Sequence, residues 1–520
     1  MTDASTGTTA DSYDVLVYGA TSGGVCAAVA AAEAGARVAL AEPGRHVGGM
    51  TSGGLGYTDL GDLRVVGGFA ARFRQDVADH YGVTPGTYAG PEPHVAESIF
   101  LRWLEQAGVE LRFGRAVAGA EIADGRIELV RFTDGTALAG DVVIDASYEG
   151  DLLAAAGVSY AVGREGRAAY GESLAGRQEM LPGRHAMPPW ISPFAGDPAP
   201  GVVGELLPQI KAGPPADVGT GDGGVMSYGY RVCLTTAQDR IPFERRAGYD
   251  ESYFDLARRL FHRWERERFE VTAGWMIGLE PNLPVGKCDA NSLGPMSLSV
   301  LDGTAWEYPD ASPPRREEIR RHHLQHAQDF LWFLTHDPEV PGRVRREMSR
   351  WGLPREEFAD TGHLPHQLYV REARRMVGEH VLTEHDLLRP RPVADAVAMG
   401  SYNIDIREVQ RTWRWVYEFD GPQAVVFNEG YLSLPVPPYP VPYRALLPRR
   451  HECRNLLVPV CVSASHVAFA SVRMEVQYQM LGQAAGLAAA RAARCGTDVH
   501  DVDMTDLGEA LRAAGQILSV

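Results

Sequence analysis

The segment Tyr13–Pro43 places an apolar run, a glycine-rich turn, an alanine-rich stretch and a second apolar run in direct succession. Val15–Tyr18 has the continuous apolar character of a buried parallel strand. Gly23 and Gly24 give the start of the following helix room for a close approach. Because Glu42 then closes the second run, this order predicts the first half of a mononucleotide-binding βαβ unit.

The glycine fingerprint of this unit falls on Gly19, Thr21 and Gly24, so a threonine stands at its second glycine position. The fingerprint alone is a weak signal, but strand, turn, helix, strand and acid together are a strong one. A helix N-terminus favours a pyrophosphate, and an acid in the position of Glu42 hydrogen-bonds a ribose 2′-hydroxyl. We therefore expect a ligand that contains an adenosine diphosphate group.

A second glycine cluster, His46–Leu55, follows within a few residues of Glu42. A nicotinamide enzyme does not need this cluster, whereas extended FAD requires backbone that lies flat along its pyrophosphate, ribityl chain and ring. Two later segments fit the same domain: a buried strand with a small-residue turn at Asp141–Gly157, and a strand, polar turn and long helix from Asn455. The four segments together favour FAD.

In this order, the four segments resemble bacterial FAD-dependent oxidoreductases with a glutathione-reductase-like fold, a group sometimes labelled xanthan-lyase-like. Three further blocks, Gly286–Pro295, His366–Asp386 and Gly400–Trp413, look like signatures of that group, so the resemblance covers most of the chain. It implies an α/β protein with a discontinuous FAD-binding Rossmann domain and a second, α+β substrate domain.

The expected organisation has four parts. They are a disordered tail (1–12), the first part of the FAD domain (13–165), a substrate or cap region (166–440) and the closing part of the FAD domain (441–520). Within the cap region we expect an alternating strand at Ser227–Thr236 and a helix-rich stretch at Pro313–Leu382, capped by Ser312. The proline- and glycine-rich segment 181–224 is interpreted as an active-site lid rather than a passive loop.

Composition excludes several classes of protein. A net charge of −17 without any basic run argues against nucleic-acid binding. Six cysteines without a CxxC pair argue against a disulfide framework and a disulfide reductase. Without a signal peptide or an apolar run long enough to span a bilayer, we expect a cytoplasmic protein that does not enter a membrane. A homo-oligomer is left open.

The expected cofactor contacts come from every segment of the FAD domain. They are Gly19, Ala20, Thr21, Ser22, Gly23, Gly24, Glu42, Pro43, His46, Gly48, Gly49, Met50, Val117, Ala146, Ser471, Arg473 and Met474. His46 precedes the second glycine cluster, and contact with the pyrophosphate or ribityl chain is favoured over covalent attachment of the flavin.

His466 is the expected catalytic base, because it lies in the turn before the last long helix, which faces the flavin ring in this architecture. The competing interpretation is a structural histidine in that turn. The resemblance also implies that Tyr369, Arg371, Tyr402 and Asn403 shape the substrate pocket. Arg371 and its neighbour Glu372 are equally compatible with an internal ion pair.

No metal is expected. His322, His323 and His326 share one predicted helix, but no HExxH pattern or third ligand accompanies them, so we interpret this face as solvated. No GxSxG elbow and no glycosidase-like pair of acids is evident.

The sequence thus favours an FAD-dependent oxidoreductase acting on a small polar molecule, such as a sugar, a polyol or a natural-product intermediate. The flavin would be reoxidised by oxygen or another acceptor. The alternatives are an NAD(P)H-fed flavin monooxygenase or reductase and a non-catalytic flavin-binding protein.

Overall fold

The computed structural model describes residues 11–279, 281–418 and 421–520. Most of the expected tail, residues 1–10, lies outside the described residues. Asp11 and Ser12, assigned to the tail from sequence, are the first two residues of strand β1 (Asp11–Tyr18) and pair with Leu138 and Ala139.

A seven-stranded sheet forms one part of the molecule, with β1 near its centre. Its strands follow the order β3-β2-β1-β6-β5-β4, and β19 also pairs with β6. Their bounds are β2 Val38–Glu42, β3 Glu110–Phe113, β4 Val117–Ala123, β5 Arg126–Phe132, β6 Ala137–Asp145 and β19 Leu456–Leu457. β3, β2, β1, β6 and β19 run parallel, whereas β4 and β5 continue from β6 as an antiparallel meander.

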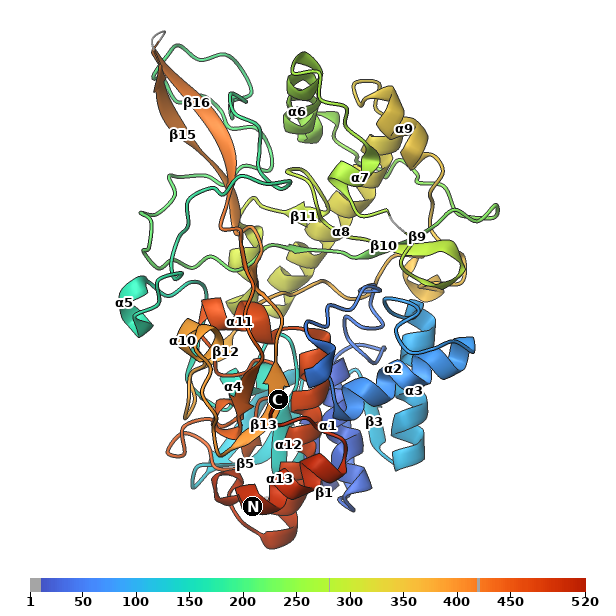
Figure 1. Cartoon of the computed structure of the whole chain (residues 1–520), viewed down its shortest axis with the longest axis vertical. Helices are drawn as coiled ribbons and strands as arrows, with labels where there is room; N and C mark the ends of the chain where they lie inside the picture. Colours follow the sequence, from blue (N-terminus) through green and yellow to red (C-terminus); the bar gives the residue numbers. More distant parts are fainter. Residues whose placement is uncertain (1–10, 280, 419–420) are drawn as a thin grey trace, which may run out of the picture.

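One face of the sheet is covered by two closely packed helices, α1 (Ser22–Glu33) and α12 (Glu475–Cys495), which lie side by side in Figure 1. Small residues make this packing close: a Cβ at Gly482 would lie 2.0 Å from the Gly23 carbonyl oxygen. The opposite face buries Leu16 and Tyr18 against the meander. Helices α2 (Gly68–Tyr81), α3 (Pro93–Ala107) and α13 (Met504–Ala513) complete this part.

The second part of the molecule lies at the opposite end from the sheet (Figure 1). It holds short two-stranded sheets, the long hairpin of β15 (Gln410–Glu418) and β16 (Gly421–Glu429), and the helices α6 (Asp255–Arg266), α7 (Ala273–Met276), α8 (Pro313–His336) and α9 (Gly342–Met348). The predicted α/β class with a Rossmann-like sheet is thereby confirmed.

Three predicted elements differ from the structure. The strand expected at Ser227–Thr236 is split into β8 (Tyr228–Gly229) and β9 (Val232–Thr235), and both are buried throughout instead of alternating. Helix α8 begins at Pro313 after the N-cap Ser312, as predicted, but no α-helix lies between Met348 and Glu384. Prolines and glycines interrupt that stretch, so helical hydrogen bonding cannot continue.

The third difference is the last long helix, which is two helices. α11 (His466–Val472) is separated from α12 by Arg473 and Met474. Ser465 caps α11, because its hydroxyl accepts a hydrogen bond from the Ala468 amide at 3.1 Å. His466 is thus the first residue of a short helix, not part of a turn before a long one.

The segment 181–224 contains no helix or strand in the structure. Phe194 anchors it by packing against Trp413 and Trp415 of the β15–β16 hairpin. Asp222, near its end, forms an ion pair with the buried Arg164 at 2.6 Å. Its role as a lid remains a prediction.

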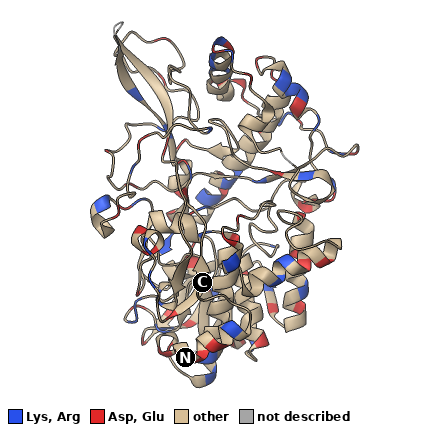
Figure 2. Ribbon diagram, viewed as in Figure 1, with Lys and Arg blue, Asp and Glu red and all other residues tan. Residues whose placement is uncertain are grey.

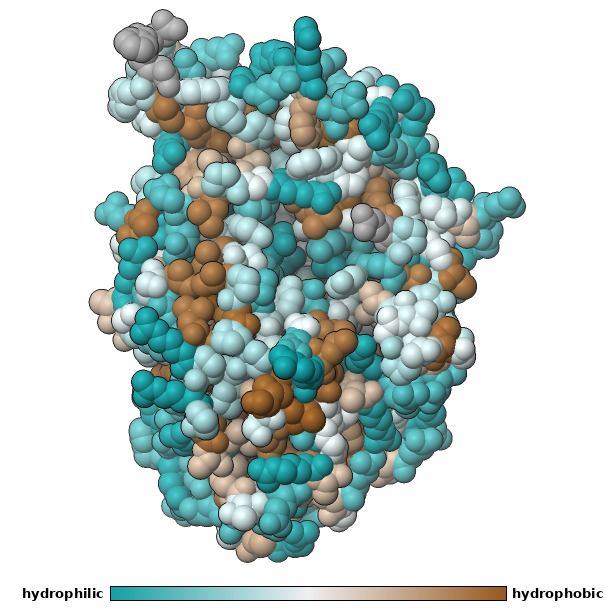
Figure 3. Space-filling model, viewed as in Figure 1, coloured by the Kyte–Doolittle hydropathy of each residue, from teal (hydrophilic) through white to brown (hydrophobic). Residues whose placement is uncertain are grey.

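On the face shown in the figures, neither charged nor hydrophobic residues form one large patch. Figure 2 shows acidic and basic residues intermixed on both parts. Figure 3 shows hydrophobic residues in separate small groups among hydrophilic ones. Within the described residues, no helix combines the length and the apolar character that a membrane span requires.

Candidate functional site

The turn between β1 and α1 has the geometry of a phosphate-binding loop. Thr21, at the second glycine position of the fingerprint, is the N-cap of α1 and accepts a hydrogen bond from the Gly24 amide at 3.1 Å. Its hydroxyl also donates to the Ala146 carbonyl at 2.8 Å. Gly24 is required by close approach, because a Cβ there would lie 1.9 Å from the Gly19 carbonyl oxygen. Threonine therefore replaces the glycine without disturbing the turn.

Glu42 lies at the carboxyl end of β2, directly beside this turn. Its carboxylate accepts hydrogen bonds from the Ala20 and Gly44 amides, both at 2.7 Å. Burial raises the pKa of Glu42 to about 7, against the lowering effect of these two amides. The side chain fits the position in which an acid holds the ribose hydroxyls of an adenine dinucleotide.

A cavity of about 420 Å³ opens between the turn and the second glycine cluster. Seven of the predicted cofactor residues line it: Gly19, Ala20, Thr21, Glu42, Pro43, His46 and Gly49. Sequence analysis missed the other lining residues, which are Gly44, Arg45, Ser147, Tyr148, Glu149, Arg320, Asp360, Thr361, His366, Gln367 and Leu368. The last three belong to the block that resembles the family, and this was the available signal for them.

Glu475, the first residue of α12, joins the loops around the cavity, although sequence analysis did not single it out. Its buried carboxylate accepts hydrogen bonds from the hydroxyls of Ser22 at 2.6 Å, Thr51 at 2.9 Å and Tyr148 at 2.6 Å. Burial raises the pKa of Glu475, and these three hydroxyls oppose the rise. The Tyr148 oxygen in turn accepts from the Met50 amide at 2.8 Å. One carboxylate thus fixes both glycine-rich segments.

The remaining predicted cofactor residues lie close to these groups or away from the cavity. The Gly48 amide donates to the Ala20 carbonyl at 2.7 Å, which joins the two loops, and Gly23 packs against α12. The Val117 amide donates to the Tyr18 hydroxyl at 3.3 Å, and Val117 does not line the cavity. Ser471 donates to the Tyr402 carbonyl at 2.5 Å, and Met474 is the buried N-cap of α12.

His46 lies at the cavity edge, stacked on His366 with ring centroids 3.9 Å apart. Its two ring nitrogens pair with Glu97 and Asp360, each at 3.1 Å. The hydrogen bond to Glu97 is the main cause of a raised pKa at His46. By contrast, burial lowers the pKa of His366 to about 4, with the neighbouring His46 as a further cause. Glu97 thus favours the protonated form of His46, whereas burial favours the neutral form of His366.

His466 forms a dyad with Glu372. Nδ1 of the imidazole lies 2.8 and 2.9 Å from the two carboxylate oxygens of Glu372, and the side chains of both residues are almost fully buried. Glu372 also pairs with Arg375, and the Met226 amide donates to it at 3.2 Å. Because a carboxylate only accepts, Nδ1 carries the hydrogen and the lone pair of the neutral ring stands on Nε2. Nε2 is buried and has no partner in the described part of the chain.

Two of the residues expected at the substrate pocket, Tyr369 and Tyr402, contact the end of α11. The Tyr369 hydroxyl lies 3.2 Å from Nη1 of Arg473, which also pairs with Asp405 at 3.1 Å. The Arg371 guanidinium stacks on the Tyr369 ring at 4.4 Å. Tyr402 joins the end of α11 through Ser471, and burial is the main cause of its raised pKa. The side chain of Asn403 forms no hydrogen bond with the described residues. The alternative of an ion pair between Arg371 and Glu372 is not observed, because Glu372 pairs with Arg375 instead.

The residues present fit FAD. The Gly19–Gly24 turn and Glu42 match its adenosine diphosphate half, and the cavity continues past Gly49 toward Gln367 and Leu368. Several buried nitrogens have no hydrogen-bond partner in the part of the chain that the structure describes, among them His466 Nε2, Gln477 Nε2, Arg473 Nε and Arg231 Nε. Buried polar atoms are normally satisfied, so these nitrogens are candidates for contact with a ligand.

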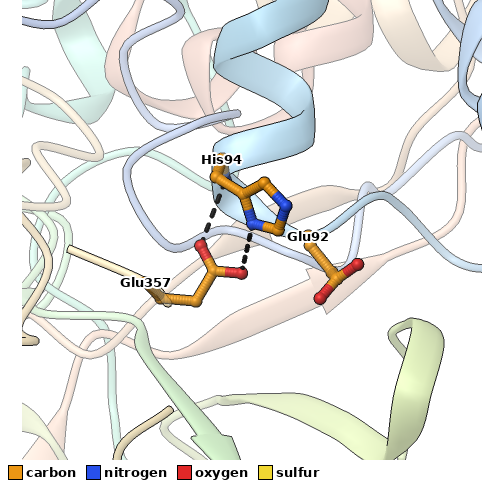
Figure 4. Close-up of side chains that lie close together, drawn as sticks. All are labelled: Glu92, His94 and Glu357. Atoms are coloured by element: carbon orange, nitrogen blue, oxygen red, sulfur yellow. Dashed lines mark hydrogen bonds and ion pairs between the residues drawn. The ribbon is translucent and has the colours of Figure 1, made fainter. Parts of the chain in front are cut away.

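One group of possible metal ligands is found within residues 11–279, 281–418 and 421–520. Figure 4 shows Glu92, His94 and Glu357 close together, with Nδ1 of His94 2.7 Å from Glu357. The ammonium group of Lys287 already serves as the cation there, because it pairs with Glu92, with Glu356 at 2.6 Å and with Glu357 at 2.9 Å. This cluster connects the first turn of α3 to the second part of the molecule.

The interpretation of the α8 histidines as a solvated face was wrong. His323 and His326 are buried, and their ring nitrogens contact the carbonyls of Ile319 at 2.9 Å and Ser297 at 2.8 Å. Burial lowers their pKa values to about 4 and about 3. His322 is partly exposed and pairs with Asp302 at 2.8 Å. Tyr253 and Phe254 cover this side of the helix. The polar side chains of the helix alone do not predict that it is covered there.

A match to a protein-family model identifies the family of this chain. The model described as FAD dependent oxidoreductase matches residues 14–511, nearly the whole sequence. The fold and site therefore define a flavoprotein oxidoreductase. The chain belongs to the FAD-dependent oxidoreductase family, and its cofactor is FAD.

Other comparisons are more distant. No curated protein matches the chain. Among solved structures, it is similar to THI4 of Thermovibrio ammonificans (18% identity, 30% of this chain and 66% of that chain, TM-score 0.24). It is also similar to L-proline dehydrogenase from P. horikoshii (16% identity, 30% of this chain and 59% of that chain, TM-score 0.25). A third similar structure is the myxobacterial chondrochloren halogenase CndH (20% identity, 30% of this chain and 41% of that chain, TM-score 0.24). The chain thus spans less than two thirds of each of these proteins.

The raised pKa of Glu42 predicts that FAD binding depends on pH. Ribose hydroxyls donate to the carboxylate form, so affinity for FAD should rise with pH until about 7 and fall up to about tenfold per pH unit below it. The folded-state pKa lies above the unfolded value, so this group's contribution to apoprotein stability is full below about 4.3 and is lost as pH rises through about 7. FAD titrations of the apoprotein at several pH values measure the first effect. Glu42→Gln should flatten it, and an unchanged slope in that variant would contradict the assignment.

Proposed function

We propose that the protein oxidises a small polar alcohol, such as a sugar, a polyol or a natural-product intermediate, and that His466 is the proton acceptor. The observation that supports this most strongly is the His466–Glu372 dyad. The buried carboxylate of Glu372 sets the imidazole tautomer, and Nε2 of His466 is buried without a hydrogen-bond partner among the described residues. This is the arrangement of a general base and its orienting acid.

In the proposed reaction, Nε2 of His466 takes the hydroxyl proton of the substrate. The adjacent carbon then loses its hydrogen with the bonding electron pair, and the C–O bond becomes a carbonyl. When bound, FAD would supply the two-electron acceptor for that hydride at N5, and oxygen or another acceptor would reoxidise it. Glu372 stabilises the imidazolium that forms, and Arg375 holds Glu372 in place.

An NAD(P)H-fed monooxygenase or reductase is the second candidate function. A pyridine nucleotide bound in a domain of its own would need a second parallel sheet with a glycine-rich turn. Apart from the seven-stranded sheet, the sheets of the described residues have two strands each. The observation favours direct oxidation of an organic substrate. A non-catalytic flavin-binding protein would have no use for the dyad.

Glu372→Gln tests the dyad. Flavin reduction by the fastest-reacting member of a panel of sugars, polyols and hydroxy acids should slow at least about tenfold, because the amide no longer fixes the productive tautomer. Anaerobic stopped-flow absorbance measures this rate. Bound FAD and reoxidation by oxygen should stay near the wild-type level, and Glu33→Gln on the exposed face of α1 is the matched control. If Glu372→Gln reduces its flavin at the wild-type rate, Glu372 does not take part in the proposed reaction.

A further inference from the structure

Arg371 is a buried cation without an acidic partner. Its side chain is 4% exposed, and its Nη1 donates to the Ser227 backbone carbonyl. The guanidinium otherwise contacts the face of Tyr369. Among the described residues, no carboxylate lies within ion-pair distance of it. Burying a charge without a counter-ion is costly, so such groups are normally paired.

Each of the neighbouring arginines has an acidic partner or several hydrogen bonds. Arg231 pairs with Asp289 at 2.6 Å, Arg473 with Asp405 at 3.1 Å and Arg407 with Glu408 at 3.3 Å. Arg411 is equally buried and also has no acid, but it is hydrogen-bonded to the Asn428 side chain and to backbone carbonyls. Arg371 therefore differs from these four arginines, because it has neither an acidic partner nor more than one hydrogen bond among the described residues.

The electrostatic surroundings agree with a missing anion. Burial lowers the pKa of Arg371 to about 9; Tyr369 opposes this effect, and the nearby Arg407, Arg473 and Arg231 add to it. An anion placed beside the guanidinium would reverse this situation, because an opposite charge favours the ionised form.

Arg371 also lies close to the proposed reaction centre. The segment Tyr369–Glu372 runs along α11, since Tyr369 contacts Arg473 at the end of that helix and Glu372 contacts His466 at its start. Seven residues of helix span about 10 Å. The chain segment that contacts both ends of this short helix therefore carries Arg371. Ser227, whose carbonyl contacts Arg371, has a buried hydroxyl without a partner among the residues that the structure describes.

We propose that the substrate carries a carboxylate group that pairs with Arg371 while its hydroxyl-bearing carbon faces His466. This rests on the proposed function and narrows it to small hydroxy acids, sugar acids included. Guanidinium–carboxylate pairs are strong and directional, so Arg371 would select for the acid and position it. The reaction then converts the alcohol of a hydroxy acid to a keto group, with the proton going to His466 and the hydride to FAD.

The test uses FAD-loaded protein and simple anions instead of the unidentified substrate. Acetate should perturb the visible flavin spectrum saturably and raise the unfolding temperature, whereas acetamide, its neutral analogue, should do neither. Inorganic phosphate tests the alternative of a tetrahedral anion. In Arg371→Met the dissociation constant for acetate should rise about 10- to 100-fold, and Arg371→Lys should lie between the two.

Folding is controlled in the same experiment. Arg371→Met removes an unpaired buried charge, so its unfolding temperature without ligand should stay at or above the wild-type value, while the exposed Arg64→Met should bind acetate like the wild type. Equal responses to acetate and acetamide, unchanged acetate binding in Arg371→Met, or a preference for phosphate would each overturn the proposal. Acetate binding that depends on Arg371 would survive a finding that His466 is not the base, so the two proposals fail separately.

Discussion

His466→Ala is expected to slow flavin reduction by substrate about 10²- to 10⁴-fold, the usual contribution of a positioned general base. The variant should keep its FAD, because the Gly19–Gly24 turn and Glu42 are formed by residues that do not contact His466. Reoxidation by oxygen should change little, since that half-reaction does not use the substrate proton. Anaerobic stopped-flow reduction and aerobic reoxidation, measured on the same preparation, separate the two steps.

The exposed His451→Ala is the matched control and should reduce its flavin at the wild-type rate. His466→Gln offers a second variant of similar shape if the alanine variant is poorly folded. Near-wild-type reduction in both His466 variants would make the histidine structural. The proton acceptor would then have to be sought among the nearby groups, of which Tyr369 and Tyr402 carry hydroxyls.

Lys287→Met is expected to destabilise the folded protein by roughly 3–5 kcal/mol, the usual effect of removing one partner from a buried ion pair. Burial lowers the pKa of Lys287, but hydrogen bonds to Glu356, Glu92 and Glu357 outweigh it and raise the pKa. Without the ammonium group, the buried carboxylates of Glu92 and Glu357 lose the cation they share, and among the described residues only the exposed His94 imidazole remains beside Glu357. Urea unfolding followed by fluorescence measures the loss.

Lys211→Met provides the control, because Lys211 is partly exposed and lies over the Trp306 ring without an acidic partner. It should change the free energy of unfolding by less than about 1 kcal/mol. Lys287→Arg should restore part of the stability, since it keeps the charge. If Lys287→Met unfolds at the wild-type urea concentration, the cluster in Figure 4 does not hold the two parts of the molecule together.

The nucleotide-binding end of the site follows from the sequence because its determinants are local. Gly19, Thr21 and Gly24 lie within one turn of chain, and Glu42 is fixed relative to them by the parallel pairing of β1 and β2. Periodicity and turn chemistry are enough to predict such a unit. The family resemblance then extended the prediction to His366–Asp386, which supplies both the cavity wall and Glu372.

The contacts that could not be predicted join residues far apart in the chain. Glu475 meets Ser22 across 453 positions, and Glu372 meets His466 across 94. Nothing in the residues around Glu475 separates it from an ordinary acid in the first turn of a helix. Local patterns also misled at His323 and His326, where a polar type suggested exposure but packing against Phe254 buries the helix face. Tertiary packing decided each of these.

The central claim is that an organic substrate, rather than a pyridine nucleotide, reduces the flavin. It is tested most directly by mixing the anaerobic, FAD-loaded wild-type protein with a panel of sugars, polyols and hydroxy acids and, separately, with NADH and NADPH. We expect rapid bleaching of the flavin absorbance by at least one organic acid or alcohol and none by either nucleotide on the same timescale. Bleaching by NADH or NADPH alone would contradict it and make the protein a nucleotide-fed reductase or monooxygenase.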